Sequence, residues 1–153
     1  MARERWDALV RGEGCPLCRV VQATQVDDKH GFFVADLSSG RLRLAADQHL
    51  PGYCLLISRN HVREPHELDR QERIAFFEDL SRVGEALERV YRAVKMNYQI
   101  LGNSVPHLHC HIQVPYHGDP YPDRPVPPVQ HWDPLSPQEY RDRVFAIRSA
   151  LAL

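Results

Sequence analysis

The sequence contains no apolar run long enough to cross a bilayer, and its charged N-terminus has no apolar segment behind it that would act as a signal peptide. We therefore expect a cytoplasmic protein. Neither sign of charge dominates, because 19 Lys and Arg residues stand against 20 Asp and Glu residues, for a formal net charge of −1. This balance argues against a broad electrostatic surface for nucleic acid or for a membrane, so we expect neither as a partner. Internal repeats are also absent.

What is present is an ordinary globular composition of 153 residues, 43% hydrophobic and 25% charged. These values predict one domain with a hydrophobic core. We assign that core to residues 1–115, and we expect 116–153 to form a proline-rich tail and a C-terminal helix packed on the same domain. Six prolines within 115–128 exclude a helix or a central strand there. The tail should therefore lie extended over the surface, above the site or a partner subunit.

Hydrophobic periodicity divides the core into strands and one long helix. Strands are predicted at 31–37, 41–46, 53–58, 96–101 and 107–112, and strand 41–46 should be half-buried. A helix is predicted over 69–95, with Phe77 and Val94 in its apolar stripe, and a final helix starts at Ser136. The spacing of the strands favours an antiparallel meander. We therefore expect about five antiparallel strands with the long helix packed on them.

The four cysteines fall into two groups. Cys54 and Cys110 lie among apolar residues and are expected to be small core residues. Cys15 and Cys18 form a C-x-x-C pair, which can bind a metal ion, act as a redox pair or be merely structural. No βαβ pattern surrounds the pair, which weakens the redox interpretation. The chain lacks a second C-x-x-C, so any further metal ligands must come from other residues, and histidines are plentiful.

Three histidines, His107, His109 and His111, recur at every second position. Successive side chains of a strand point to opposite faces, so these three imidazoles should share one face. The alternate residues should face the core; they are Leu108, Cys110 and Ile112. The preceding polar run, 102–106, can present amide and hydroxyl donors beside them. Such an arrangement suits metal binding or phosphate chemistry, whereas the simplest alternative is that the histidines merely alternate on a half-exposed strand.

The run from Gly102 to His111 resembles the signature of the histidine-triad (HIT) family, in which the alternating histidines follow a Gly-Gln/Asn-Ser/Thr-Val element. The C-x-x-C pair and the order of strand 53–58, His61 and the long helix agree with the bacterial, dinucleoside polyphosphate hydrolase-like branch of this family. The resemblance covers roughly residues 15 to 115. It implies a HIT-like α+β fold with a five-stranded antiparallel sheet.

Three positions depart from the family pattern. Gln113 is polar where an apolar residue is usual, and Val114-Pro115-Tyr116 replaces the Pro-Arg that often follows the triad. Tyr53 stands where many members carry a histidine. These departures bear on the substrate more than on the chemistry.

The resemblance implies a nucleotide hydrolase or transferase that cleaves at the α-phosphate through a covalent nucleotidyl-histidine. His109 would be the nucleophile, and its other ring nitrogen needs a backbone acceptor to fix the tautomer. His111 would donate a proton or a hydrogen bond near the scissile oxygen. Ser104 would assist catalysis, holding phosphate oxygens together with Asn103. The substrates would be dinucleoside polyphosphates, nucleoside phosphoramidates or similar compounds.

Two further residues are candidate substrate ligands. Asp47 can accept hydrogen bonds from both ribose hydroxyls, although an ordinary loop-capping aspartate is an equal alternative. Asn97, at the start of the predicted strand 96–101, is the second candidate.

The resemblance also implies a structural zinc ion and a homodimer. The zinc ligands would be Cys15, Cys18, His61 and His107. The proline-rich tail and the C-terminal helix are candidate cross-subunit arms. Two other functions remain open from the sequence: a nucleotide-binding regulatory protein with little turnover, and a metalloenzyme that uses the three triad histidines as one metal face.

Overall fold

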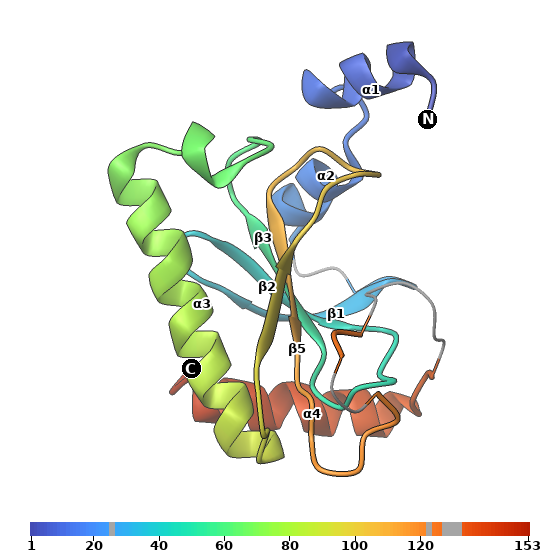
Figure 1. Cartoon of the computed structure of the whole chain (residues 1–153), viewed down its shortest axis with the longest axis vertical. Helices are drawn as coiled ribbons and strands as arrows, with labels where there is room; N and C mark the ends of the chain where they lie inside the picture. The colour runs from blue at the N-terminus through green and yellow to red at the C-terminus, as the bar shows by residue number, and fades with distance from the viewer. Residues whose placement is uncertain (25–26, 122–123, 127–132) are drawn as a thin grey trace.

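The computed structural model describes residues 1–24, 27–121, 124–126 and 133–153. Its helices and strands are α1 (Arg3–Val10), α2 (Pro16–Gln22), β1 (Gly31–Asp36), β2 (Gly40–Ala45), β3 (Cys54–Ser58), the short 3-10 helix η1 (Pro65–Glu67), α3 (Arg70–Tyr91), β4 (Asn97–Ile100), β5 (His109–Gln113) and α4 (Pro137–Ala150). The strands form one antiparallel sheet in the order β1-β2-β3-β5-β4 (Figure 1). This α+β arrangement confirms the predicted fold. Among the described residues, none of the helices is both long and apolar enough to cross a membrane.

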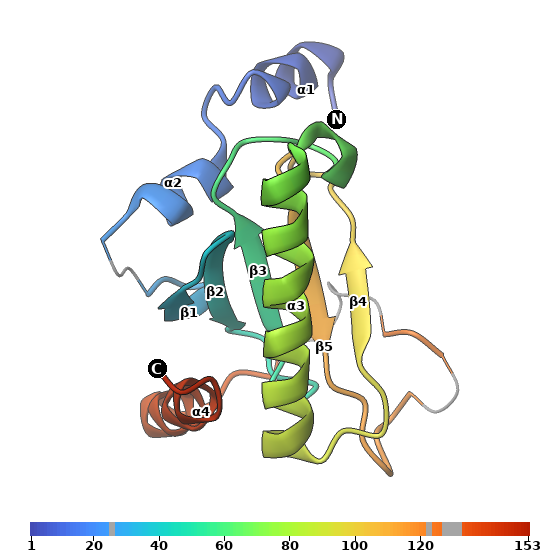
Figure 2. The same ribbon diagram turned by 90° about the vertical axis from the view of Figure 1, so that its left-hand side faces the viewer.

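Helix α3 lies along one face of the sheet (Figure 2). The predicted capping box is present, because the Asp69 carboxylate accepts from the backbone N–H of Glu72 and the Glu72 side chain accepts from that of Asp69. The helix ends earlier than predicted, since Arg92 adopts a left-handed conformation with φ +52°. Its sheet-facing side chains are buried; they are Phe76, Leu80, Val83 and Leu87. Phe77 and Val94 are 44% and 47% exposed, so their assignment to this stripe was wrong.

Helix α4 packs against β1 and α3, as Figure 1 shows at the foot of the molecule. The side chain of Ser136 caps it, and Tyr140 stacks on Phe32 with the ring centroids 3.9 Å apart. The C-terminal helix therefore shares the core of the sheet, as expected. The domain boundary at residue 115 stays a prediction. Part of the proline-rich tail, including Pro122, Pro127 and Pro128, lies outside the described residues.

Strand β2 is buried along its whole length, so the expectation of a half-buried strand was wrong. Arg43 is buried because it pairs with Asp28 and donates to the carbonyl of Gly31. Arg41 is buried because of α2, a helix that was not predicted from the sequence, as α1 was not. The Arg41 guanidinium pairs with Asp36 at 2.8 Å, and it donates to the carbonyls of Val20 at 2.7 Å and Ala23 at 2.6 Å near the end of α2. Because the last carbonyls of a helix lack intrahelical partners, this contact ties α2 over the polar face of β2.

The interior strand β5 has one face on the hydrophobic core and carries His109 and His111 on the other. Its neighbours are β3, in which Leu55 pairs with His111, and β4, in which Gln99 pairs with His111. Cys54 and Cys110 are buried in the core on the α3 side, as predicted. Leu108 and Ile112 are buried there too. The strand begins at His109, two residues later than expected, so His107 belongs to the loop that leads into it.

Candidate functional site

His109 and His111 lie side by side on the face of the sheet opposite α3. Their ring centroids are 5.0 Å apart, and each residue is only 8% exposed. The alternative that the histidines merely alternate on a half-exposed strand is therefore wrong. Two imidazoles held this closely in a nearly dry environment can act together on one bound group.

The tautomer of His109 is set by the backbone. Its Nδ1 lies 2.6 Å from the carbonyl oxygen of His107, and because a carbonyl can only accept, Nδ1 carries the proton. The Nε2 lone pair is then available to attack an electrophile. Burial lowers the pKa of His109, and the hydrogen bond to the His107 carbonyl opposes this only in part, so the ring is neutral at pH 7. This is the backbone acceptor that the proposed nucleophile requires.

His111 contacts a residue that the sequence analysis noted only as a departure from the family. The hydroxyl oxygen of Tyr53 lies 2.6 Å from Nδ1 of His111. Burial, and next the neighbouring His109, lower the pKa of His111 to about 4, so this ring is also neutral at pH 7. Strand alternation places Tyr53 on the same face as Leu55, two residues further on, but the pairing of Leu55 with His111 comes from the sheet register and could not be taken from the sequence.

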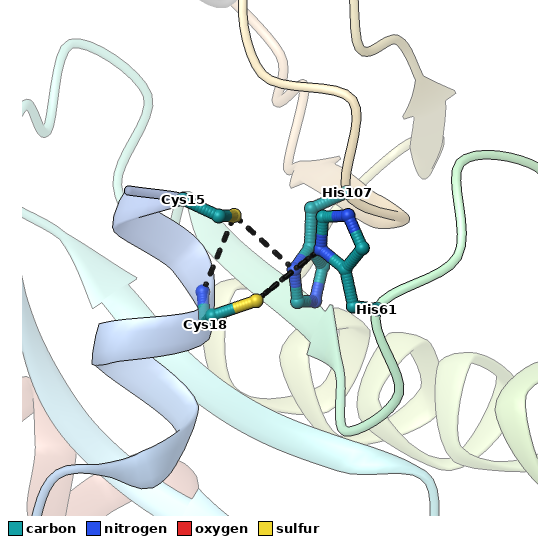
Figure 3. Close-up of side chains that lie close together, drawn as sticks. All are labelled: Cys15, Cys18, His61 and His107. Atoms are coloured by element: carbon teal, nitrogen blue, oxygen red, sulfur yellow. Dashed lines mark hydrogen bonds between the residues drawn. The ribbon is translucent and has the colours of Figure 1, made fainter. Parts of the chain in front are cut away.

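A second group of side chains gathers where α2 meets the loops after β3 and before β5. Cys15 and Cys18 come from the start of α2, and they face His61 and His107 (Figure 3). Nδ1 of His107 lies 3.6 Å from the sulfur of Cys15 and 3.4 Å from that of Cys18, and Nδ1 of His61 lies 3.2 Å from the sulfur of Cys18. The structure thus brings together all four residues of the predicted ligand set.

The hydrogen bonds of the two histidines orient their lone pairs toward the cysteines. Nε2 of His107 donates to the carbonyl of Ser58 at 2.8 Å, and Nε2 of His61 donates to that of Val10 at 3.1 Å. Both Nδ1 atoms are therefore unprotonated in the neutral rings, and they face each other at 3.2 Å. Such facing lone pairs repel each other unless a cation or a hydrogen-bond donor, such as the Cys18 thiol, lies between them. Carbonyls that fix ligating histidines in this way are typical of metal sites.

The dimensions of the cluster fit a tetrahedral ion. The four ligand atoms all lie within 4.8 Å of one another. Ligand bonds of about 2.0–2.3 Å in tetrahedral geometry place the ligand atoms about 3.3–3.8 Å apart, close to the contacts seen here. All four cysteines of the chain are free, so the pair is not tied up in a disulfide. The cluster can hold a metal ion.

The same contacts disfavour a metal face made of the three triad histidines. Both nitrogens of His107 are engaged, one with Ser58 and the other toward Cys15 and Cys18. Nδ1 of His109 is engaged with the backbone. His107 therefore belongs to a different cluster from the two other triad histidines.

The predicted substrate ligands do not form one cluster in the structure. Asn103 and Ser104 are exposed on the loop between β4 and β5, close in sequence to the triad. Asn97 lies at the opposite end of β4, paired with Gln113, and lines a surface cavity of about 680 Å³. The structure therefore places Asn97 and Asn103 at opposite ends of β4.

Asp47 occupies the loop between β2 and β3. Its Oδ1 accepts from the backbone N–H of His49 at 3.1 Å and from that of Asp133 at 3.2 Å, and it lies 3.0 Å from Nδ1 of His49. The capping role that the sequence left open is thus present. These contacts also anchor the segment that leads into α4 beside the triad face.

Comparison with protein families shows that residues 27–118 match the HIT domain family. Comparison with curated proteins yields no match.

The fold is similar to that of a histidine triad protein from Bradyrhizobium japonicum, with 27% identity and a TM-score of 0.75, covering 80% of this chain and 92% of that chain. It is also similar to a hypothetical histidine triad nucleotide-binding protein from Sulfolobus tokodaii, at 20% identity and a TM-score of 0.70, covering 90% and 92%. A zinc-bound histidine triad family protein from Mycobacterium smegmatis matches at 18% identity and a TM-score of 0.67, covering 90% and 93%.

Proposed function

This chain belongs to the histidine-triad (HIT) family, and from that membership we propose that it is a nucleotide hydrolase or nucleotidyl transferase that cleaves its substrate at the α-phosphate through His109. The observation that carries the proposal is the 2.6 Å hydrogen bond from Nδ1 of His109 to the His107 carbonyl, which leaves Nε2 as a free lone pair. The substrate would be a dinucleoside polyphosphate, a nucleoside phosphoramidate or a similar nucleoside phosphate derivative.

The reaction would proceed in two displacements at phosphorus. In the first, the Nε2 lone pair of His109 forms a bond to the α-phosphorus while the bond to the leaving group breaks, and the bonding electrons depart with that group. In the second, a water oxygen or another acceptor attacks phosphorus, the P–N bond breaks, and its electrons return to Nε2. The proton of the attacking water passes to solvent or product. Nδ1 stays protonated throughout, because the His107 carbonyl holds that proton.

Three other residues would assist at the reacting phosphate. His111, 5.0 Å from His109 between ring centroids, would donate a hydrogen bond to the departing atom. Asn103 and Ser104 would donate to the phosphate oxygens, where negative charge builds in the transition state. Their exposure on the loop before β5 leaves them free to meet a ligand. Asp47 would accept from the ribose hydroxyls, and Asn97 would contact a more distant part of the substrate.

We propose that the cluster of Cys15, Cys18, His61 and His107 is a structural zinc site. Two cysteines and two histidines suit zinc, and four protein ligands leave no open position for a substrate. The relative from Mycobacterium smegmatis is described as zinc-bound, which supports this assignment. A bound zinc ion would supply a cross-link rather than catalysis, fixing α2 to the loop that carries the backbone acceptor of His109.

A homodimer is also proposed. The large apolar side chains exposed on α3 and at β4 are Ile74, Phe77, Tyr98 and Leu101. β4 is an edge strand of the described sheet, and its Tyr98 packs so closely on α3 that a Cβ at Gly84 would collide with the hydroxyl. Helix α4 is a weaker candidate for a cross-subunit arm, because its apolar stripe is used within its own chain.

The proposed function is tested by replacing the nucleophile in the full-length protein. A panel of adenosine and guanosine phosphate derivatives should identify a substrate, and His109→Asn should abolish its turnover while nucleotide binding and folding persist. A rapid acid quench of the wild-type protein should trap nucleotide attached to His109. Wild-type turnover in His109→Asn, or a label on another residue, would refute the mechanism. Nucleotide binding without any turnover would instead favour a regulatory nucleotide-binding protein.

A further inference from the structure

We propose that Tyr53 is a positioning residue for this reaction: its hydroxyl donates to Nδ1 of His111 and so keeps the proton of that imidazole on Nε2, where it faces the departing group. The catalytic part of this inference rests on the proposed function. The placement of the proton does not, and it can be measured on its own.

The contact between the two side chains is short and well enclosed. The hydroxyl oxygen lies 2.6 Å from Nδ1, and Tyr53 and His111 are 3% and 8% exposed. The rings are tilted by 31° with centroids 6.0 Å apart, so they meet at their polar atoms and do not stack face to face. Tyr53 is held from the other side by His49, whose ring meets it edge-on at 5.6 Å. Its hydroxyl therefore has little freedom to leave His111.

Both partners are neutral at pH 7. Burial, and next the charge of Asp47, raise the pKa of Tyr53 far above its usual range, so the phenol keeps its proton. Burial lowers the pKa of His111 to about 4, so the imidazole carries a single proton. Two arrangements satisfy the 2.6 Å contact: the phenol donates to an unprotonated Nδ1, or a protonated Nδ1 donates to the phenol oxygen.

The two arrangements differ in what His111 offers to a ligand. If Tyr53 donates, Nε2 carries the proton and can donate it in a hydrogen bond to the departing oxygen or nitrogen. If Nδ1 donates, Nε2 presents a lone pair, which would repel an atom that is gaining negative charge. Only the first arrangement assists bond cleavage. The inferred tautomers are therefore opposite in the two neighbouring rings, with a nucleophilic Nε2 on His109 and a donating Nε2–H on His111.

Tyr53 is a residue at which the chain departs from the usual HIT pattern, and the proposed contact gives it a role. A phenol donates through a single O–H and stays neutral over a wide pH range when buried, whereas a histidine at this position would have two tautomers of its own. Tyr53 thus fixes the tautomer of His111 without adding another group that titrates near neutral pH.

The first test is the position of the proton in the wild-type protein. Full-length protein labelled with ¹⁵N-histidine should show His111 protonated at Nε2 and unprotonated at Nδ1 near pH 7, the signal being assigned by its loss in His111→Gln. In Tyr53→Phe the same signal should move toward a mixture of tautomers. In Tyr91→Phe it should not move, because that buried hydroxyl belongs to α3, on the opposite face of the sheet from His111, and has no hydrogen-bond partner among the described residues.

The second test is kinetic. With the substrate found in the panel, Tyr53→Phe should lower kcat about 10- to 100-fold, most for poor leaving groups, and should leave KM nearly unchanged. Tyr91→Phe should retain wild-type values. A merely structural role for Tyr53 would change stability without this selective effect on kcat or on the tautomer.

The outcomes separate this inference from the proposed function. Protonation of His111 at Nδ1 in the wild-type protein, or an unchanged tautomer and kcat in Tyr53→Phe, would overturn the inference even if the enzyme turns over nucleotides. If no derivative is turned over, the proposed function fails, and the wild-type ¹⁵N spectrum still decides where Tyr53 places the proton. A poorly folded Tyr53→Phe would not affect that wild-type measurement.

Discussion

At the scale of single residues, backbone carbonyls decide which nitrogen of each histidine can react. His109 donates through Nδ1 to the carbonyl of His107, so its Nε2 is free. His107 and His61 donate through Nε2 to the carbonyls of Ser58 and Val10, so their Nδ1 atoms are free. Two histidines only two positions apart thus present opposite ring nitrogens, which in the proposed function would serve a phosphate and a metal ion respectively.

The depressed pKa of His111 should make stability depend on pH in a defined window. The folded pKa is about 4 against about 6.5 in an unfolded chain, so the unfolded state binds more protons between these values. Protonation of His111 therefore does not change stability well above pH 6.5, and wild-type stability falls as the pH drops toward 4, by up to about 3 kcal/mol from this residue. The groups around it are His109 on its own strand, Tyr53 before β3 and the neutral Gln99 of β4.

The measurement is urea unfolding of the wild-type protein and of His111→Gln at pH 7, 5.5 and 4. The difference in free energy of unfolding between the two proteins should shift in favour of the variant as the pH falls, because glutamine cannot be protonated. The histidines remote from His111 titrate in both proteins and cancel in the comparison, whereas His109 loses a neighbouring imidazole in the variant. A difference that stays constant from pH 7 to pH 4 would contradict the assigned pKa.

The residues of the site could be predicted to different extents. Cys15, Cys18, His61 and His107 were assembled correctly from motif spacing and the family resemblance. Tyr53 was noted, but its contact was not foreseen, because it depends on the register that sets Leu55 of β3 opposite His111 of β5. Two residues 58 positions apart meet only through that register, and no local pattern encodes it.

At the scale of elements, the long periodic segments were predicted well and the short ones were missed. The strands were found from apolar runs or period-two alternation, and α3 from its helical periodicity. Helices α1 and α2 have eight and seven residues, too few to show a clear period, and α2 is held by contacts to distant residues. Missing α2 also contributed to the error on β2, because Arg41 of that strand is buried where it holds this helix.

The attachment of α2 should depend on the metal. Purified protein from zinc-replete medium should contain about one zinc ion per chain, and Cys15→Ala should lose it. Since the cluster joins α2 to the loops beside β3 and β5, this variant should also lose more than about 2 kcal/mol of stability, seen as a lower Tm. Metal analysis by mass spectrometry and thermal unfolding are the two measurements.

A matched cysteine variant separates the metal site from general core packing. Cys54→Ala removes a buried thiol from the core on the α3 side, so it should lower Tm while retaining zinc. The metal assignment fails if the wild-type protein holds no stoichiometric metal and Cys15→Ala leaves Tm unchanged.

At the scale of the whole molecule, the two faces of the sheet differ in polarity. One face is dry and apolar under α3, and the other carries the buried histidines, the arginines of β2 and the contacts to α2. Among the described residues, a few large apolar side chains stay exposed between the charged residues of α3 and on the adjoining edge strand β4; they are Ile74, Phe77 and Tyr98. Exposed apolar side chains that gather beside an edge strand are typical of an interface between proteins, because an edge strand can pair with another chain.

We expect these apolar side chains to form the contact between two copies of the chain. A two-fold dimer would bring Phe77 of each copy into the same buried region, so Phe77→Lys should place two unpaired charges there and shift the protein to monomers at micromolar concentration. Phe145→Lys is the control: this residue on α4 is 72% exposed, far more than Phe77 at 44%, and its replacement should leave the dimer intact. Light scattering measures both. A monomeric wild-type protein would reject the dimer, and a Phe77→Lys dimer would place the interface elsewhere on the surface.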